Sequence, residues 1–155
     1  MNYGLIVIIV PMTIKVPLTI LDLHDEGFHH LLYIQLFGQT YTLVLDTWAS
    51  KTAFDKTLLQ AHDDALILAS DKLSTGLGTN DMESFTAVIP NLYIGDLQVP
   101  PFEVAVLDLS TINIAYRQLK HPEILGVLGG DILMKYKAVI DYGKRELRLK
   151  KSRSS

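Results

Sequence analysis

Apolar and polar residues alternate along much of this chain, and the dominant period is two residues. In Thr13–Ile20 every second position is apolar, namely Ile14, Val16, Leu18 and Ile20. Alternation of this kind predicts a β-strand with one buried face. Pro17 places the strand at a sheet edge or at a bulge, because proline has no N–H to donate to a neighbouring strand.

The same criterion predicts strands along most of the remaining chain. In order they are Leu31–Phe37, Thr40–Leu45, Asn91–Ile94, Leu97–Val99, Phe102–Leu107, Lys137–Asp141 and Glu146–Leu149. The two-residue link Gly38-Gln39 favours a type II′ hairpin, because glycine stands first. Gly95-Asp96 and a turn that contains Gly143 are expected to close two further hairpins.

Helical periodicity is scarce and predicts only short helices. Ser110 is expected to cap a helix whose apolar face consists of Ile112, Ala115, Tyr116 and Leu119. Asp55–Ala61 is long enough for one or two helical turns. Asp131 is expected to cap a helix that continues through Ile132, Leu133 and Tyr136. Together the elements predict an all-β fold, a closed or nearly closed β-barrel with one or two short helices.

Length and composition narrow the possible functions. The 155 residues suit a single domain, 1–155, with a core at about 12–150. A net charge of −3 gives no electrostatic basis for binding nucleic acid. The absence of cysteine excludes disulfides and thiol catalysis. The five histidines lack the spacing of metal ligands, so neither a metal nor another cofactor is expected.

The apolar run Leu5–Val10 is the one segment that raises the question of a membrane. It is too short to span a bilayer, and it lacks the basic leader and the cleavage site of a secretory signal. We therefore interpret it as a strand or an ordered arm. The expected location is not in a membrane, and it is the cytoplasm by default.

Three segments carry candidate chemistry. Asp46-Thr47-Trp48-Ala49-Ser50 follows an apolar strand, and taken alone it is a turn with local hydrogen bonds. Val127-Leu128-Gly129 precedes a predicted helix, where glycine relieves crowding. The stretch Gly76-Leu77-Gly78-Thr79 is a glycine-rich connection that suits either a mobile flap or a plain surface loop.

The order of these three segments resembles that of the retropepsin-like aspartic proteases, and most of all their single-lobe relatives in bacteria. The resemblance extends from about Leu31 to Leu149 and is best in Gly126–Leu149. The family's active-site turn is usually Asp-Thr-Gly-Ala-Ser. This chain matches that turn except at Trp48, which stands where glycine is expected.

The resemblance implies a mechanism and roles for named residues. Asp46 would be the catalytic acid, and a homodimer would supply its second copy, since each chain has one such turn. Two adjacent carboxylates share a proton and activate water to attack a peptide bond. Thr47 would brace the two turns, Ser50 would support Asp46, and Gly76–Thr79 would close over an extended peptide substrate. Val127, Leu128 and Gly129 would pack behind the turn.

Trp48 leaves alternatives open. Its side chain is expected near the cleft or near the dimer axis, with weak activity on generic peptides as the result. One alternative function is a catalytically silent member of the same fold that binds peptide or forms a dimeric scaffold. Another is an unrelated small β-barrel whose turn matches by chance.

Overall fold

The computed structural model describes residues 4, 12–62, 67–69 and 85–151. The strands before the midpoint of the chain are β1 Met12–Pro17, β2 Thr19–Asp22, β3 Phe28–Leu36, β4 Gln39–Leu45, β5 Ala53–Asp55 and β6 Ile67–Ala69. The later strands are β7 Phe85–Ile89, β8 Leu92–Ile94, β9 Leu97–Val99, β10 Phe102–Leu107, β11 Gly126–Leu128, β12 Val139–Asp141 and β13 Glu146–Lys151. The helices are α1 Lys56–Gln60, α2 Ser110–Gln118 and α3 Gly130–Lys135, with a 3₁₀ turn η1 at His24–Glu26.

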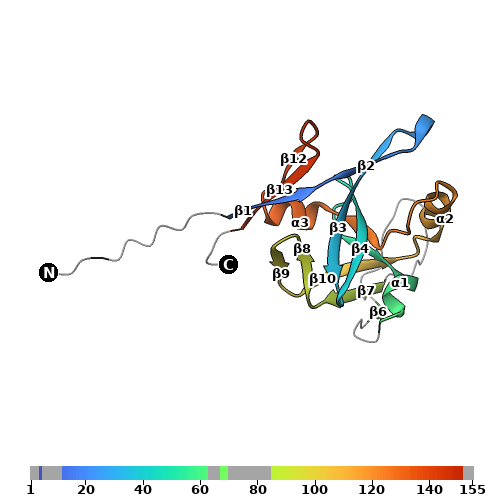
Figure 1. The fold of residues 1–155 in the computed structure, drawn as a ribbon. Helices are drawn as coiled ribbons and strands as arrows, with labels where there is room; N and C mark the ends of the chain where they lie inside the picture. Colours follow the sequence, from blue (N-terminus) through green and yellow to red (C-terminus); the bar gives the residue numbers. More distant parts are fainter. Residues whose placement is uncertain (1–3, 5–11, 63–66, 70–84, 152–155) are drawn as a thin grey trace.

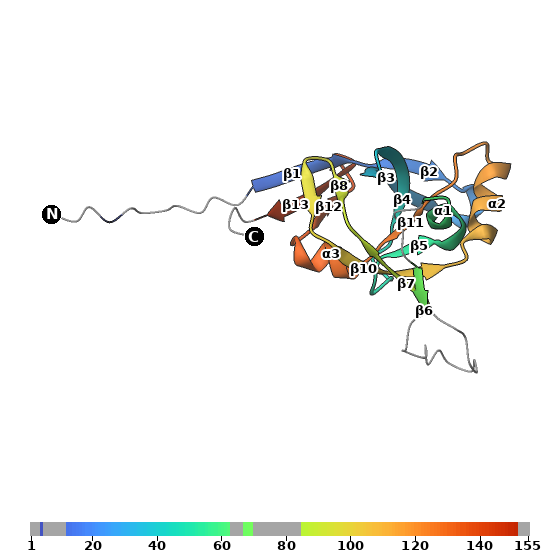
Figure 2. The ribbon, with the colours of Figure 1, turned by 90° about the horizontal axis from the view of Figure 1, so that it is seen from below.

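These strands form two sheets around one main core. The large sheet has ten strands in the order β6-β7-β10-β5-β11-β4-β3-β8-β9, and β2 pairs with β3 beside this path. The small sheet has the order β1-β13-β12. Figures 1 and 2 show α2 at one end of the molecule and the β1–β13 pair at the other. The predicted all-β barrel fold with few short helices is confirmed, and its sheet curls into a half-barrel.

The β3–β4 hairpin is buried on both of its faces at the end that holds Leu31 and Val44. Alternate side chains of a strand point to opposite sides. One set, which includes Leu32 and Leu43, packs into the main core. The other set contributes Leu31 and Val44 to a smaller cluster with Tyr116 of α2. The helix α2 therefore covers the outer face of this hairpin at Leu31 and Val44.

The hairpin link differs from the prediction by one residue. Leu36 pairs with Gln39, so the link is Phe37-Gly38. Both of these residues have positive φ, 52° and 73°, as a type I′ turn requires and a type II′ turn does not. The prediction was wrong because phenylalanine at positive φ is rare and gives no sequence signal. Burial of the flanking apolar residues sets the register instead.

The strand predicted at Thr13–Ile20 is two strands that belong to different sheets. β1 pairs with β13, whereas β2 pairs with β3. The chain changes partner at Leu18, whose N–H donates to the carbonyl of Arg145 at 2.9 Å. The predicted burial of Ile14, Val16 and Leu18 is confirmed, since each is at most 5% exposed.

The later hairpins follow the sequence closely. The Gly95-Asp96 hairpin joins β8 and β9, and β10 has the predicted bounds. β12 begins at Val139 rather than at the predicted Lys137. Lys137 has a positive φ of 48°, which is not a β-strand conformation. The segment Leu5–Val10, which we interpreted as a strand or an ordered arm, lies outside the described residues. No helix in the described part of the chain is long and apolar enough to cross a membrane.

The predicted cap and apolar face of α2 are both corrected. Ser110 is the first helical residue, and the Asp108 carboxylate accepts its N–H at 2.9 Å. Hydrogen bonds from the Ser110 hydroxyl and N–H hold the pKa of Asp108 below its usual range. The buried side chains of α2 are Asn113 and Tyr116. The other members of the predicted face are exposed: Ile112, Ala115 and Leu119.

Candidate active site

The site is built where β11 lies between β4 and β5. β11 runs parallel to β4 and antiparallel to β5. The loop that joins β4 to β5 must therefore pass across the end of β11. This crossing places Asp46 at the point where two adjacent strands end, and its N–H donates to the carbonyl of Leu128 at 3.1 Å.

The Asp46 carboxylate is half-buried and is oriented by the loop itself. Its Oδ1 accepts the N–H of Trp48 at 2.9 Å and the N–H of Ala49 at 3.3 Å. Among the described residues, no donor is bonded to its Oδ2. One oxygen is thus fixed by backbone donors, while the other remains able to bind water or substrate.

The N-terminal end of α3 supports this loop from behind. The N–H of Gly130 donates to the carbonyl of Ala49 at 2.7 Å, and the N–H of Asp131 donates to that of Ser50 at 3.1 Å. A Cβ on Gly129 would lie 2.7 Å from the carbonyl carbon of Lys51 and 2.9 Å from the oxygen of Ala49. Glycine is required there because the two backbones touch.

Thr52 connects the loop to α3, and sequence reasoning missed it. Its fully buried hydroxyl accepts the N–H of Gly129 at 3.0 Å and donates to Asp131 Oδ1 at 2.7 Å. That oxygen also accepts the N–H of Thr52 at 2.9 Å. Asp131 is therefore a tie between two segments, and Gly129 is the N-cap residue of α3. The expectation that Asp131 caps this helix is corrected accordingly.

The tip of the loop makes few contacts within the chain. Thr47 and Ser50 are exposed, and the Trp48 side chain is 96% exposed. Trp48 is not among the described residues with positive φ. The backbone at this position therefore does not need glycine, and the indole meets no obstacle within one protomer.

A cavity of about 300 Å³ adjoins Asp46. Its walls come from three places: β3 and β4, the end of β11 with the segment before it, and α2. The lining residues are His29, Val44, Leu45, Asp46, Ile112, Ile124 and Val127. A wider hollow of about 670 Å³ lies at the β3–β4 hairpin tip, and its lining residues include Tyr93 but no carboxylate or histidine.

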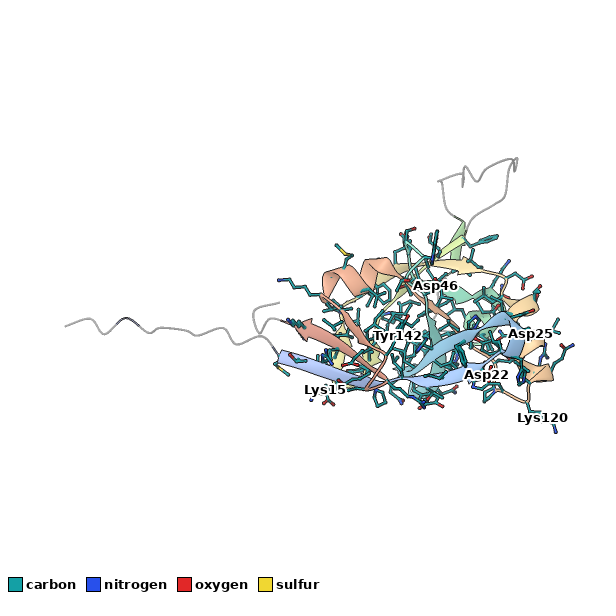
Figure 3. The ribbon with its side chains drawn as sticks, turned by 90° about the horizontal axis from the view of Figure 1, so that it is seen from above. Lys15, Asp22, Asp25, Asp46, Lys120 and Tyr142 are labelled. Carbon is teal, nitrogen blue, oxygen red and sulfur yellow. The ribbon has the colours of Figure 1, made fainter. Side chains whose placement is uncertain are left out.

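Asp141 and Asp55 have structural roles elsewhere in the fold. Figure 3 shows Asp46 apart from Asp22 and Asp25. Asp141, expected to be a hairpin residue, accepts the N–H of Lys144 at 2.9 Å in the β12–β13 turn. Asp55 caps α1 and also accepts the N–H of Leu109. Among the described residues, Asp46 is thus the one carboxylate that lines this cavity.

The predicted residues behind the Asp46 loop have two different surroundings. Leu128 is buried in the main core, and Val127 lines the cavity. The proposed flap, Gly76–Thr79, lies outside the described residues. Within the described ranges, no group of three acidic or histidine side chains is placed to hold a metal ion.

Comparison with solved structures identifies the fold. The chain is similar to a retropepsin-like aspartic protease from Rickettsia conorii, with a TM-score of 0.53, 18% identity and coverage of 93% of this chain and 94% of that one. It also matches the retroviral protease-like domain of Ddi1 from Leishmania major, with a TM-score of 0.46, 11% identity and coverage of 77% and 86%. The first likeness is the stronger one.

Neither protein-family models nor curated proteins match the chain. An identity of 18% shows the fold alone. We conclude that the chain has a retropepsin-like fold, as the resemblance in the sequence implies.

Proposed function

We propose that this protein is an aspartic endopeptidase that acts as a homodimer, with one Asp46 from each chain. The observation that supports this most is the half-buried Asp46 carboxylate at the junction of β4 and β11, oriented by two backbone donors and facing an apolar cavity. A half-buried carboxylate that lines a cavity and is oriented by backbone donors is a candidate catalytic group.

The chemistry needs two such groups. Two carboxylates held close together cannot both ionise, so they share one proton. The ionised one takes a proton from water as the water attacks the peptide carbonyl, and the protonated one donates to the carbonyl oxygen. Because the described part of each chain offers one carboxylate at this cavity, the second comes from the partner copy across a two-fold axis.

Trp48 fits this proposal as a dimer contact. Its N–H still donates to Asp46, so the hydrogen bond that glycine would provide is retained. Its indole does not line the cavity beside Asp46 and is almost fully exposed in one chain. Exposed tryptophans next to a symmetry axis are strong interface anchors. We propose that the partner protomer covers it.

The test is Asp46→Asn, which keeps the shape of the side chain and removes its acid–base chemistry. We expect cleavage of a peptide library to fall by ~10²- to 10⁴-fold, the usual contribution of acid–base groups. Unfolding midpoint and dimer mass by sedimentation serve as controls. Equal cleavage by the variant would reject Asp46 as the catalytic acid. A wild-type dimer that is inert from acidic to neutral pH would favour the silent-scaffold alternative.

A further inference from the structure

Positive charge is concentrated at the end of the molecule that holds the small sheet. Residues 135–153 contain eight of the 14 lysines and arginines but two of the 17 aspartates and glutamates, which gives them a net charge of +6. The remainder of the chain therefore carries −9. β1 adds Lys15 to the basic end, because it pairs with β13. A chain with a net charge of −3 thus has one strongly basic region.

Two lysines of this region lie on the outer face of the small sheet. Residues directly opposite each other in an antiparallel pair point to the same side, and so do alternate residues of one strand. Lys15 lies opposite Arg148, and Lys150 is two residues further along β13. Their neighbours Ile14 and Leu149 point the other way, into the main core. Both lysines are exposed to solvent.

A third lysine and an apolar residue extend this outer face. The N–H of Lys150 donates to the carbonyl of Tyr136 at 2.7 Å, so the backbone of Lys137 lies next to β13. Lys137 is exposed as well. Val139 of β12 joins the face through its pairing with β13, and it is 40% exposed. We call the surface formed by Lys15, Lys137, Val139 and Lys150 the basic face.

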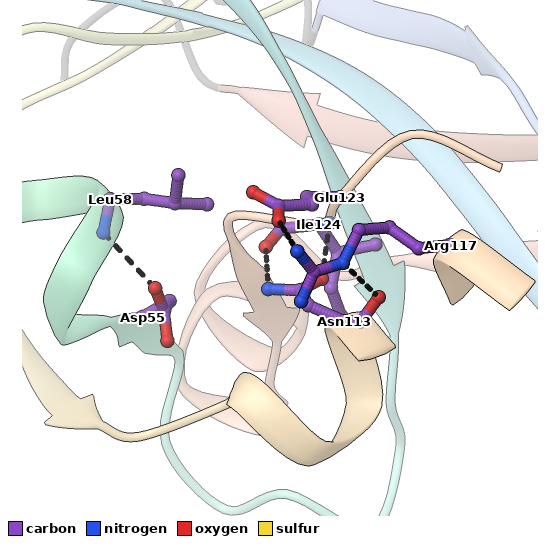
Figure 4. Close-up of polar contacts among 6 residues, drawn as sticks. All are labelled: Asp55, Leu58, Asn113, Arg117, Glu123 and Ile124. Atoms are coloured by element: carbon purple, nitrogen blue, oxygen red, sulfur yellow. Dashed lines mark hydrogen bonds and ion pairs between the residues drawn. The ribbon is translucent and has the colours of Figure 1, made fainter. Parts of the chain in front are cut away.

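The three lysines of the basic face have no ion-pair partner within the described part of the chain. Arg148 in the middle of the sheet is held instead by Asp141 at 3.1 Å and by Glu146 at 3.0 Å. An ion pair also forms at the α2 end, where Arg117 lies 3.5 Å from Glu123 (Figure 4). Residues 1–11 and 152–155, which flank β1 and β13 in the sequence, contain no aspartate or glutamate. The charge of the basic face is therefore open to a partner.

An acidic polypeptide segment matches this face better than a large polyanion does. Attraction between exposed charges acts over about 8–10 Å in physiological salt. A short run of aspartate or glutamate therefore contacts the basic face without meeting the negative charge elsewhere. A nucleic acid or an anionic bilayer is larger than the face and would also meet the remainder of the chain, which carries −9. Lysine also lacks the planar fork with which arginine binds phosphate groups.

We propose that the basic face binds an acidic segment of the substrate protein, at a distance from the bond that is cut. The inference rests on the proposed peptidase function, since the same substrate must also reach Asp46. Figure 3 shows Lys15 well apart from Asp46, so a segment bound there does not touch the reacting groups. Contact at this second surface adds to the affinity for the substrate. It should therefore lower KM and leave kcat unchanged.

The experiment compares one cleavable peptide that carries either a glutamate tail or a glutamine tail. The tail is attached through a flexible linker, on either side of the cut sequence. The full-length wild type should cleave the glutamate-tailed peptide with a kcat/KM ~5-fold higher on at least one side, through KM alone. High salt should remove this difference. Equal kcat/KM for the two tails would overturn the proposal, while cleavage itself would leave the peptidase function standing.

Charge reversals at matched positions test where the tail binds. Lys15→Glu and Lys150→Glu should each remove at least about half of the preference for the glutamate tail. Lys120→Glu is the control, because Lys120 is exposed and lies at the opposite end of the molecule from Lys15, as Figure 3 shows. The three variants change the net charge equally, and each should cleave the tail-free peptide as the wild type does, which also shows that it is folded. An equal loss of preference in Lys120→Glu would assign the effect to overall charge and overturn the proposal.

Failure of the peptidase function gives a different result. If the wild type cleaves no peptide, binding of the two fluorescently labelled tails is measured by anisotropy. Binding of the glutamate tail that is weakened in Lys150→Glu and kept in Lys120→Glu would support the basic face, and equal binding of the two tails would overturn it. Vesicles with phosphatidylserine and a DNA duplex are titrated in parallel. If either binds through Lys150 more tightly than the glutamate tail does, the acidic-segment proposal is wrong.

Discussion

The back and the tip of the Asp46 loop differ in how completely one chain determines them. Behind the loop, Thr52 and Gly129 are buried, and backbone atoms of two segments touch. At the tip, Thr47 and Trp48 are exposed and contact little of their own chain. The contacts that orient Asp46 therefore all lie within one protomer. We propose that another molecule completes the site.

The largest effect is expected behind the loop. Gly129→Ala should destabilise the protomer by ~3 kcal/mol, because its Cβ would overlap the backbone of Lys51. Gly130→Ala is the control, since its Cβ would lie 3.4 Å from the nearest atom, the oxygen of Ala49. It should stay within about 1 kcal/mol of wild type. Urea unfolding of both variants measures the difference, and equal stabilities would contradict the tight contact.

Thr52 lies behind the Asp46 loop and Thr47 lies at its tip, so variants of the two test how these regions differ. Thr52→Val leaves the buried N–H of Gly129 without its acceptor, so we expect a loss of ~2 kcal/mol of protomer stability. Thr47→Val removes an exposed hydroxyl and should change protomer stability by less than ~0.5 kcal/mol. If Thr47 braces the dimer as proposed, that variant should instead raise the dimer dissociation constant in sedimentation. If Thr47→Val lowered protomer stability and Thr52→Val did not, the difference between the back and the tip of the loop would be refuted.

The sequence predicts the strands around this site better than the contacts behind the Asp46 loop. Period-two alternation identifies β3, β4 and β10 because each has a buried face. It does not identify β11, since the two apolar residues between Gly126 and Gly129 are too few to show a period. Nor does it identify Thr52, whose importance comes from a contact with Asp131 far along the chain. The face of α2 was mispredicted because its buried polar residue, Asn113, binds the backbone of Ile124. Hydrophobicity alone cannot reveal such a contact.

Trp48→Ala probes the tip alone. Protomer stability should change by less than ~0.5 kcal/mol, since the side chain is almost fully exposed. The dimer dissociation constant should rise ~30-fold, which corresponds to ~2 kcal/mol for an interface anchor. Trp48→Gly should behave alike, with equal or higher activity per dimer. An unchanged dissociation constant would remove Trp48 from the interface.

The smallest effect concerns acid stability far from the site. Hydrogen bonds from the Lys144 N–H and from Arg148 lower the pKa of Asp141. A lowered folded-state pKa adds stability above the ordinary aspartate value of about 4, and this contribution is lost as pH falls through the folded value. Asp141→Asn should therefore reduce stability slightly at neutral pH and less at pH 3. The pH profile of peptide cleavage should not move, because this carboxylate lies outside the cavity.

Mixing of protomers tests the central claim, that two Asp46 carboxylates make one site. Wild type is combined with an equal amount of Asp46→Asn, at a total concentration well above the dimer dissociation constant, and peptide cleavage is measured after exchange. An Asp22→Asn partner serves as the control and should leave the activity intact. Random pairing predicts that activity falls to about one quarter of that of the same total amount of wild type, because only dimers with two intact carboxylates work. A fall to about one half would mean that each protomer acts alone, and would contradict the claim.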